Sequence, residues 1–560
     1  MKYVIIGAVA GGATAAARLR RLDEKANVVI FEKSEYISYA NCGLPYYIGD
    51  VIKDRSKLLV QTASEFSARF NIDVRASSEV IGINRVEKRV TVRDLKTSES
   101  YVEHYDKLIL SPGAYPIRPA LPGIESEGVF TVRNVEDTDY MKNYLSRSQA
   151  RKAVVIGAGF IGLEMAENLH KLGMEVSVVE RGPQVLAPLD FPIAAMAQKH
   201  LRKQGVNLLL NTVVSGLLKV SGKLKVQTGD GRTLEADVIV LSAGVRPDTT
   251  LAEKAGLKLG PAKGIQVNEY LQTSDENIYA VGDAIEFANP ISGQSTITTL
   301  AGPANKQGRI CANNIVLGNK HIYKGSINTA IIRLFDLTIG VAGLAAKDLE
   351  RAGIEHVVST IHGNSHAGYY PGAKLMTIQI AFSPNTGQLL GAQVIGNDGV
   401  DKRVDLLASV IKNQGTVYDL TEIEHAYAPP FSSAKDPVNM AGFVAENIML
   451  GRLSIMQCSD VALKDGKYTL LDVRTAKEYE QGTITGAINI PLDEIRMRIH
   501  EIPIDRPVYV FCQQGMRGYL AQRILVQNNF SNVTNISGGY LLCKTCFEER
   551  AEMERQLLTA

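Results

Sequence analysis

The sequence predicts an α/β protein of several domains, and three observations support this prediction. The chain has 560 residues, more than one hydrophobic core usually organises. A strand, a glycine-rich loop, a helix and a second strand follow one another at the N-terminus, and the same order returns from residue 153. From residue 329 onward strand and helix patterns continue without such a loop, which indicates at least one further domain.

The N-terminal segment is a predicted βαβ unit. Residues 3–6 form an apolar strand, residues 7–12 a glycine-rich loop, and an alanine-rich helix extends to Asp23. A second strand at residues 27–31 is closed by Glu32. Glycines in such a loop let the backbone approach a pyrophosphate at the helix N-terminus, and the acidic residue binds the ribose hydroxyls. The residues expected at this dinucleotide are Gly7, Ala10, Gly11, Gly12 and Glu32.

The second βαβ unit repeats the pattern at residues 153–180. The first loop has Val9 at the second glycine position, and a lone loop of this kind can be only a tight strand-to-helix connection. Two copies, each closed by a glutamate, predict two bound dinucleotides. Because Glu180 would repel a 2′-phosphate, NADH is expected over NADPH, with the cation of Arg181 as an opposing influence. The residues expected at the second dinucleotide are Gly157, Gly159, Gly162 and Glu180.

The composition argues against several classes of protein. Net charge is +2, from 61 basic and 59 acidic residues, so neither nucleic acid nor an anionic membrane is an expected partner. No apolar run is long enough to span a bilayer. The apolar start after Lys2 resembles a secretory signal, but a glycine cluster and a basic helix occupy the place of a cleavage site. The cysteines are too sparse for a disulfide framework, and a cytoplasmic location is expected.

Two further motifs resemble those of the pyridine nucleotide-disulfide oxidoreductases. Residues 278–283, Ile-Tyr-Ala-Val-Gly-Asp, are similar to the second flavin motif of that family, although an aspartate there could also cap the next helix. Residues 38–46, Ser-Tyr-Ala-Asn-Cys-Gly-Leu-Pro-Tyr, place Cys42 where the family has its redox cysteine. Dithiol members have a second cysteine five positions later, where this chain has Tyr47. The motif therefore resembles the single-cysteine coenzyme A disulfide reductases and persulfide reductases.

The resemblance implies a flavin site and a coenzyme A site. Further FAD contacts are expected at Val80, Ser111, Arg133, Asp283 and Ala301. Coenzyme A is expected at Thr14, Arg18, Arg21, Ser38, Asn41 and Lys435. The first three recur at i, i+4 and i+7 and share a helix face, where two guanidinium groups could bind phosphates, although a solvated basic face is the alternative.

Cys42 is the expected catalytic residue. Thiol–disulfide exchange needs a thiolate, and flavin reduction of a disulfide needs a sulfur close to the isoalloxazine ring. The resemblance implies a mixed disulfide between Cys42 and the sulfur of the substrate. The alternative is an inert buried cysteine, which is the default interpretation of Cys311 and Cys458.

Two segments resemble the interface domain of the same relatives. They are residues 366–372, His-Ala-Gly-Tyr-Tyr-Pro-Gly, and residues 425–436, which begin His-Ala-Tyr-Ala-Pro-Pro. The resemblance implies that Tyr369 and Tyr427 hydrogen-bond or protonate the leaving sulfur, as a phenol can, and that a homodimer is needed for activity. Simple packing of both tyrosines is the alternative.

The C-terminal segment resembles a rhodanese domain. Leu-Asp-Val-Arg at residues 471–474 and Gly-Ala-Ile-Asn-Ile-Pro at residues 486–491 match its opening signature, except that Thr483 stands where histidine is common. Cys512 opens the loop at residues 512–518, whose backbone N–H groups and following helix form an anion cradle favouring a thiolate or persulfide. A structural cysteine is the alternative for Cys512.

A CxxC pair, Cys543 and Cys546, lies close to the C-terminus. It could be a dithiol or half of a metal site, but no second pair completes a zinc site and no metal is expected. A structural role is favoured over a redox accessory role.

The complete prediction is an α/β chain with two Rossmann-like dinucleotide-binding domains, an α+β dimerisation domain and a rhodanese-like α/β domain. The expected boundaries are 1–115 and 246–328 for FAD, 116–245 for NADH, 329–451 for dimerisation and 460–560 for the rhodanese-like domain. The segments at residues 110–114 and 242–247 are the expected crossings between the FAD and NADH domains.

The expected function is transfer of hydride from NADH to FAD and of electrons to sulfur held at Cys42, with release of coenzyme A thiol or hydrogen sulfide. Cys512 would supply sulfane sulfur. Two alternatives are an NADH oxidase or peroxidase that uses a Cys42 sulfenic acid, and a protein that is mainly a sulfurtransferase or sulfur carrier. Coenzyme A disulfide, coenzyme A persulfide, polysulfide and other persulfides all remain open as the physiological substrate.

Overall fold

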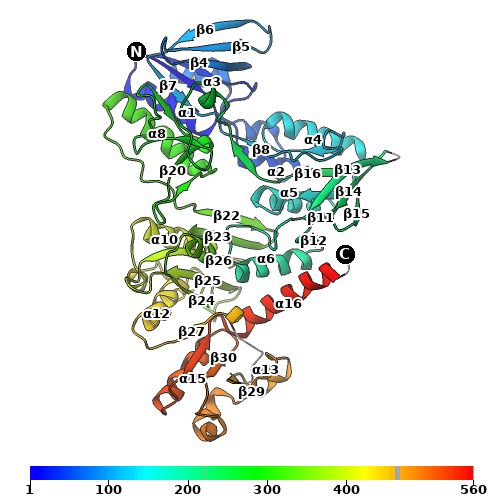
Figure 1. The fold of residues 1–560 in the computed structure, drawn as a ribbon, viewed down its shortest axis with the longest axis vertical. Coiled ribbons are helices and arrows are strands. Elements are labelled where there is room, and N and C mark those ends of the chain that lie inside the picture. Colours follow the sequence, from blue (N-terminus) through cyan, green and yellow to red (C-terminus); the bar gives the residue numbers. More distant parts are fainter. Residues whose placement is uncertain (221, 461–466, 559–560) are drawn as a thin grey trace. The chain divides into compact units, whose positions relative to one another are not determined.

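The computed structural model describes residues 1–220, 222–460 and 467–558 (Figure 1). These residues pack into two compact units, each described by itself below. The first unit contains residues 1–181 and 212–326, and the second contains residues 182–211 together with the described residues from 327 onward.

A parallel five-stranded sheet is the centre of the N-terminal part of the first unit. Its strand order is β19-β7-β1-β2-β3, and these strands are Ile278–Ala280, Lys107–Leu110, Lys2–Ile6, Asn27–Phe31 and Asp73–Arg75. Strands β1 and β2 are almost fully buried, as their continuous apolar sequences predict. Helix α1 (Ala10–Leu22) connects them and packs beside α8 (Ala301–Leu317). An antiparallel sheet of β4 (Ser78–Asn84), β5 (Arg89–Asp94) and β6 (Ser100–His104) completes this part.

A second parallel sheet repeats the design in the same unit. It contains the strand order β11-β10-β16-β9, and these strands are Glu175–Val179, Lys152–Ile156, Val238–Leu241 and Val129–Phe130. Helix α5 (Phe160–Lys171) follows β10. An antiparallel sheet is formed by β13 (Val214–Val220), β14 (Lys223–Thr228) and β15 (Thr233–Ala236).

Two short strands connect the two halves of the first unit. They are β8 (Ala114–Pro116) and β17 (Val245–Pro247), which pair antiparallel at the crossings expected from the sequence. Helix α2 (Leu44–Ile48) packs against α5 and against α4 (Val135–Ser148). The short helix η1 (Asn41–Gly43) directly precedes α2 and contains Cys42.

The second unit is built on an antiparallel sheet of order β22-β23-β26-β25-β24. These strands are Ala330–Leu334, Leu337–Gly343, Leu389–Gly396, Leu375–Phe382 and Val357–Asn364. Helix α10 (Val400–Lys412) packs on β23 and β26, and α12 (Pro437–Met449) packs on β24 and β25.

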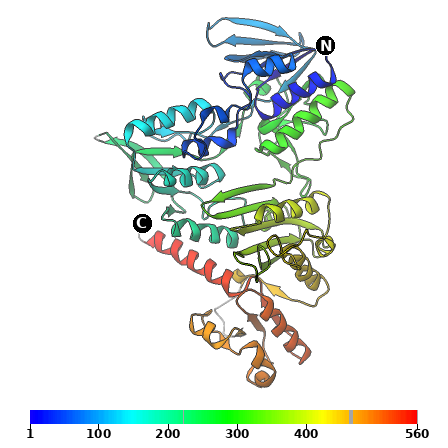
Figure 2. The same cartoon turned by 180° about the vertical axis from the view of Figure 1, so that it is seen from behind.

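The C-terminal part of this unit is a parallel sheet of order β27-β31-β30-β28-β29. These strands are Ile455–Met456, Val533–Ile536, Val508–Phe511, Thr469–Asp472 and Ile488–Asn489, with helices α13 (Ala476–Glu480), α14 (Ile495–Arg498), α15 (Met516–Gln527) and α16 (Gly539–Leu558). Figures 1 and 2 show α16 lying along α6 (Phe191–Lys203), and both belong to the second unit. The predicted α/β class is confirmed by these sheets.

Among the described residues, no helix combines the length and the apolar character that crossing a membrane requires.

Candidate functional site

The two glycine loops have the same local geometry. Gly7 and Gly157 adopt φ values of +95° and +107°, and a Cβ at these positions would lie 2.1 Å from Ser111 O and 2.2 Å from Ser242 O. In both loops the backbone therefore requires glycine at the first position. The closing glutamates are also equivalent, since a carboxylate oxygen of Glu32 accepts from Ala8 N–H at 2.9 Å and one of Glu180 accepts from Ala158 N–H at 2.8 Å.

The second glycine position explains why Val9 is tolerated. Val9 precedes α1 with φ −101°, outside the positive range that favours glycine, so φ does not require glycine there. Gly159 stands at the equivalent place, and a Cβ built on it would meet nothing within 4 Å. The loop at residues 157–162 thus leaves open space beside a helix N-terminus, which fits a dinucleotide pyrophosphate.

The other residues expected at the flavin lie at different depths in the first unit. Asp283 is in η3 (Gly282–Ala284), whose N-cap is Val281, so the side chain of Asp283 is not the cap of that helix. Burial raises the pKa of Asp283, and the guanidinium of Arg133 opposes that rise. Ser111 follows β7, Val80 is buried in the core, and Ala301 is exposed at the start of α8.

Cys42 is exposed in η1, directly before α2. Partial burial of its thiol raises the pKa, and the negative charges of Glu164 on α5 and Asp283 act in the same direction. Glu164 is held near α2, where its carboxylate accepts from the Tyr46 hydroxyl at 3.1 Å. The protein groups around Cys42 therefore favour the protonated thiol.

Two residues expected to bind coenzyme A, Ser38 and Asn41, shortly precede Cys42. The amide of Asn41, oriented to satisfy both its polar atoms, donates to Arg133 O at 2.9 Å and accepts from Arg133 Nη1 at 3.2 Å. Ser38 adopts φ +46°, and its N–H donates to Ala8 O at 2.8 Å. The Cys42 motif is thus bonded to the first glycine loop and to Arg133.

The basic face of α1 packs beside α8. Thr14 donates to Asn305 Oδ1 at 2.5 Å, and Arg18 Nε donates to Asn313 Oδ1 at 2.9 Å. Partial burial lowers the pKa of Arg18, and the neighbouring guanidinium groups of Arg309 and Arg21 lower it further. Three guanidinium groups therefore gather at this face. Arg309 was not among the residues that sequence reasoning selected, because it lies on a helix far along the chain.

Tyr369 and Tyr427 come together in the second unit. Their hydroxyl groups are 2.9 Å apart, and both side chains are exposed. This hydrogen bond raises the pKa of Tyr369. Lys435, also exposed, lies on the same irregular segment as Tyr427. The pair presents two phenol groups at the surface, where an interface or a ligand can reach them.

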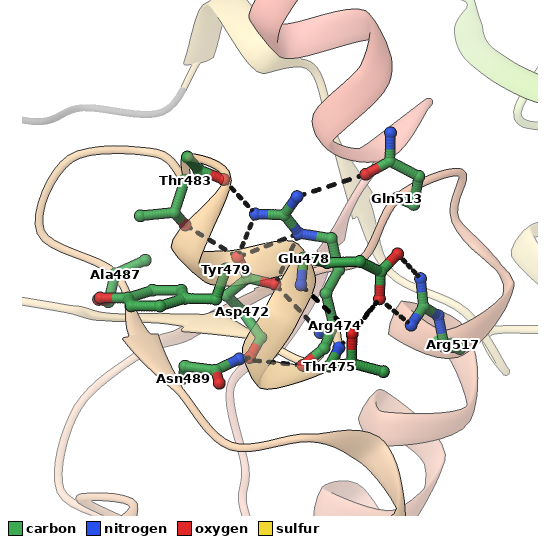
Figure 3. Close-up of polar contacts among 11 residues, drawn as sticks. Asp472, Arg474, Thr475, Glu478, Tyr479, Thr483, Ala487, Asn489, Gln513 and Arg517 are labelled. Carbon is green, nitrogen blue, oxygen red and sulfur yellow. Dashed lines mark hydrogen bonds and ion pairs between the residues drawn. The ribbon is translucent and has the colours of Figure 1, made fainter.

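Cys512 lies at the end of β30, at the start of the loop that leads into α15. Its Sγ accepts from the Gly515 N–H at 3.1 Å, and Cys512 is 2% exposed. Gly515 has φ +122°, a conformation that favours glycine at this point of the loop. Arg517 donates two hydrogen bonds of 2.7 Å to the Glu478 carboxylate, and Figure 3 shows the two side chains facing each other. The Arg517 hydrogen bonds lower the pKa of Glu478 to about 2.

A buried ion pair between Arg474 and Asp472 lies beside the Cys512 loop (Figure 3). Arg474 Nη2 lies 2.7 Å from Asp472 Oδ2, and the side chains are 2% and 0% exposed. Arg474 also reaches Gln513 Oε1 at 3.3 Å, beside Cys512. Thr483, which stands where histidine was expected, donates to Asp472 Oδ2 at 2.8 Å. The threonine hydroxyl therefore provides a side-chain hydrogen bond to this aspartate.

The CxxC pair faces the interior of the fold. Cys543 and Cys546 are 0% and 3% exposed on α16, among apolar side chains. A hydrogen bond with Cys458 and burial raise the pKa of Cys543, and burial raises that of Cys546 to about 12. Within residues 1–220, 222–460 and 467–558, no cluster of His, Cys, Asp and Glu could hold a metal ion. These observations favour a structural role for both cysteines.

Comparison with known families gives three matches. The pyridine nucleotide-disulphide oxidoreductase family matches residues 1–308, its dimerisation domain matches residues 329–437, and the rhodanese-like domain matches residues 460–544.

Individual relatives cover most of the chain. A coenzyme A disulfide reductase of Staphylococcus aureus is 36% identical over 80% of this chain and 100% of its own length. The crystal structure of reduced Bacillus anthracis CoADR-RHD superposes with a TM-score of 0.96 at 48% identity, covering 98% of both chains. An NAD-dependent persulfide reductase from A. fulgidus superposes with a TM-score of 0.90 at 36% identity, covering 97% of this chain and 100% of that one.

Proposed function

Since this chain belongs to the pyridine nucleotide-disulphide oxidoreductase family and carries a rhodanese-like domain, we propose that it uses NADH and FAD to reduce coenzyme A disulfide or coenzyme A persulfide through Cys42. The lone cysteine of the motif carries this proposal. With Tyr47 in place of a second cysteine, Cys42 has no dithiol partner in its motif, so the partner sulfur must come from the substrate.

The FAD site proposed here uses the first glycine loop, Glu32, Asp283 and Arg133. Burial raises the pKa of Glu32, while N–H groups of Ser34 and Ala8 hydrogen-bond to its carboxylate, an arrangement suited to ribose hydroxyls. The second loop and Glu180 would hold NADH. When bound, the flavin would pass electrons from NADH to the sulfur at Cys42.

The chain's own residues would carry the thiol chemistry. The thiolate of Cys42 attacks one sulfur of coenzyme A disulfide, which forms a mixed disulfide and releases one coenzyme A thiolate. By the resemblance to the single-cysteine relatives, the hydroxyl pair of Tyr369 and Tyr427 of one protomer would supply the proton to the thiolate leaving at the site of its partner. Two electrons and one proton then cleave the mixed disulfide, release the second coenzyme A thiol and restore the Cys42 thiolate. With coenzyme A persulfide the products are coenzyme A thiol and hydrogen sulfide.

We propose that the phosphates of coenzyme A bind at the basic face of α1. Arg18, Arg21 and Arg309 supply three guanidinium groups there, and the pKa of Arg18 is lowered by partial burial and further by its two like-charged neighbours. Guanidinium groups bind phosphate oxygens in bidentate fashion. The remaining proposed contacts are Thr14, Ser38, Asn41 and Lys435.

We also propose a homodimer and a sulfur-supplying role for Cys512. The match of residues 329–437 to a dimerisation domain and the exposure of the tyrosine pair support the dimer. The Gly515 N–H at Cys512 Sγ supports a bound thiolate or persulfide in the rhodanese-like domain. The proposed boundaries are 1–115 and 246–328 for FAD, 116–245 for NADH, 329–451 for the dimer and 460–560 for sulfur transfer.

Mass spectrometry under non-reducing conditions tests the proposal. After incubation with coenzyme A disulfide and no NADH, the peptide containing Cys42 should carry coenzyme A in disulfide linkage, and NADH should remove it. Cys42→Ser should show no adduct on that peptide and no turnover, while FAD content stays unchanged. Absence of an adduct in wild type, together with full activity of Cys42→Ser, would refute the proposal.

A further inference from the structure

The tyrosine pair stands on two irregular segments that need support from elsewhere. Tyr369 follows β24 on residues 365–374, and Tyr427 lies on residues 423–436 before α12. Tyr369 is 77% exposed and Tyr427 is 47% exposed, so packing of their rings does not fix the 2.9 Å contact between their hydroxyls. The positions of the two backbones must therefore determine that contact.

Backbone hydrogen bonds join the two segments a few residues from the tyrosine pair. The Ala367 N–H donates to Ser432 O at 3.0 Å, with a weaker contact to Pro429 O at 3.3 Å. Each tyrosine is thus only a few residues from a point at which its segment is bonded to the other. The segments can keep this register only if both are anchored to the domain.

Arg403 and Asp436 provide the anchor. Arg403 Nη2, on α10, lies 2.7 Å from Asp436 Oδ2, and the two side chains are 1% and 0% exposed. Arg403 Nη2 also donates to Ser365 O at 2.8 Å, at the base of the first segment. Asp436 Oδ2 accepts from the Ser432 hydroxyl at 2.5 Å, on the second segment. One buried ion pair therefore contacts both segments.

Asp436 also caps the helix that follows its segment. It is the N-cap of α12, where Oδ1 accepts from the Val438 N–H at 3.0 Å. Burial alone would raise the pKa of Asp436, but the hydrogen bonds from Arg403, Ser432 and Val438 outweigh it, and the pKa lies below its ordinary value. The carboxylate is thus ionised and fully hydrogen-bonded at neutral pH.

A buried ion pair is seldom the most stabilising choice for a domain core. Well-packed apolar residues of similar volume are often at least as stabilising, because they avoid the desolvation of two charges. Directional hydrogen bonds, however, fix the positions of the groups they reach, as apolar packing does not. This pair reaches the two segments that carry the phenol groups.

We propose that Arg403 and Asp436 are positioning residues that hold Tyr369 and Tyr427 in register for proton transfer to the leaving sulfur. Ser432 and the carbonyl of Ser365 connect the ion pair to the two segments. This inference rests on the function proposed above for the tyrosine pair, and it adds a network that touches neither substrate nor cofactor.

Ser432→Ala is the decisive variant, because it removes one link to Asp436 and leaves the buried ion pair intact. We expect kcat for coenzyme A disulfide to fall about tenfold with KM little changed, since small misplacement of a catalytic group has effects of this size. In Arg403→Lys, which keeps the charge but loses the forked geometry of the guanidinium group, kcat should fall at least as far. Thermal midpoint and FAD content are measured for every variant.

A double variant separates positioning from general loss of structure. If Ser432 acts through the tyrosines, adding Ser432→Ala to Tyr427→Phe should cause little further loss of kcat. Arg351→Gln, which removes an exposed ion pair with Asp348 in the same domain, is the matched control and should keep wild-type kcat.

Two results overturn the proposal in different ways. Wild-type turnover of Tyr427→Phe refutes the catalytic role of the tyrosines and the positioning role with it. If kcat falls in Tyr427→Phe but stays at the wild-type value in Ser432→Ala, only the positioning role is refuted. The same conclusion holds if kcat of the double variant falls by the product of the two single losses. If Arg403→Lys fails to fold, the Ser432→Ala comparison still decides.

Discussion

Cys42 lies among groups that oppose its ionisation. Partial burial raises the pKa of its thiol, and Glu164 and Asp283 raise it further. The thiolate is the form that reacts. At pH values below the pKa of Cys42 these groups therefore lower its reactivity, and at pH values well above that pKa they have no effect. Ligands bound at this site would have to supply the stabilisation of the thiolate.

Glu164→Gln should therefore lower the pKa of Cys42 and speed its alkylation at neutral pH by a few-fold. The rate of iodoacetamide labelling against pH, read by mass spectrometry of the Cys42 peptide, measures the shift. At high pH the variant and wild type should converge. Glu175→Gln, at the exposed first residue of β11, is the control, and an unchanged or slower rate in Glu164→Gln would contradict the electrostatic explanation.

Single residues also show where sequence reasoning works and where it stops. The first glycine of each loop could be predicted because its positive φ requires glycine, and the closing glutamates because they follow the dinucleotide-binding pattern. The departures at Val9 and Thr483 needed coordinates: Val9 has an ordinary φ, and Thr483 supplies a hydroxyl to Asp472. Neither fact can be read from a pattern of residue types.

At the scale of elements, two helices hold the Cys512 loop. Arg517 on α15 and Glu478 on α13 form a bidentate pair whose side chains are 32% and 31% exposed. The pair fixes the first turn of α15, and that turn follows the loop that surrounds Cys512. Solvent screening limits its contribution to stability to about 1 kcal/mol.

Arg517→Ala should weaken thiosulfate or polysulfide sulfurtransferase activity several-fold while lowering the thermal midpoint only slightly. Glu478→Gln should have a similar effect, and the double variant should be no worse than either single one, because both break the same contact. Arg523→Ala, farther along α15, serves as the control. If the losses of sulfurtransferase activity in the two single variants multiply in the double variant, Arg517 acts on the sulfur donor directly.

Helix α16 gives the CxxC pair a structural setting. Cys543 and Cys546 are buried, and α16 packs along α6 through Gln198, whose amide donates to Glu549 Oε2 at 3.0 Å. In native protein, alkylation should therefore modify Cys42 first and leave Cys311, Cys458, Cys543 and Cys546 unmodified until unfolding. Intact-mass analysis over time tests this, and rapid modification of Cys543 or Cys546 would support the redox accessory role instead.

Contacts between distant elements could not be predicted from the sequence. The motifs identified the family correctly, and the comparisons confirm that resemblance. Arg309 joins the basic face of α1 from α8, and the Arg403–Asp436 pair links α10 to the start of α12. These residues belong to no local motif, and only the packed fold brings them together.

For the whole chain, the roles proposed for Cys42 and Cys512 imply two separable activities. Cys512→Ser should abolish sulfurtransferase activity but leave reduction of preformed coenzyme A persulfide within about twofold of wild type, since Cys42 holds the reducible sulfur. Assays of both activities on one preparation test this. If Cys512→Ser stops reduction of every small substrate as completely as Cys42→Ser does, Cys512 belongs to the reductase step itself.

The stoichiometry of anaerobic turnover tests whether Cys42 transfers electrons to coenzyme A substrates. With coenzyme A disulfide as the sole oxidant, wild type should release two coenzyme A thiols for each NADH consumed, and with coenzyme A persulfide one thiol and one sulfide. Cys42→Ser should reduce both rates to background while retaining FAD. NADH consumption that needs oxygen and ignores both substrates, or full turnover by Cys42→Ser, would contradict the account.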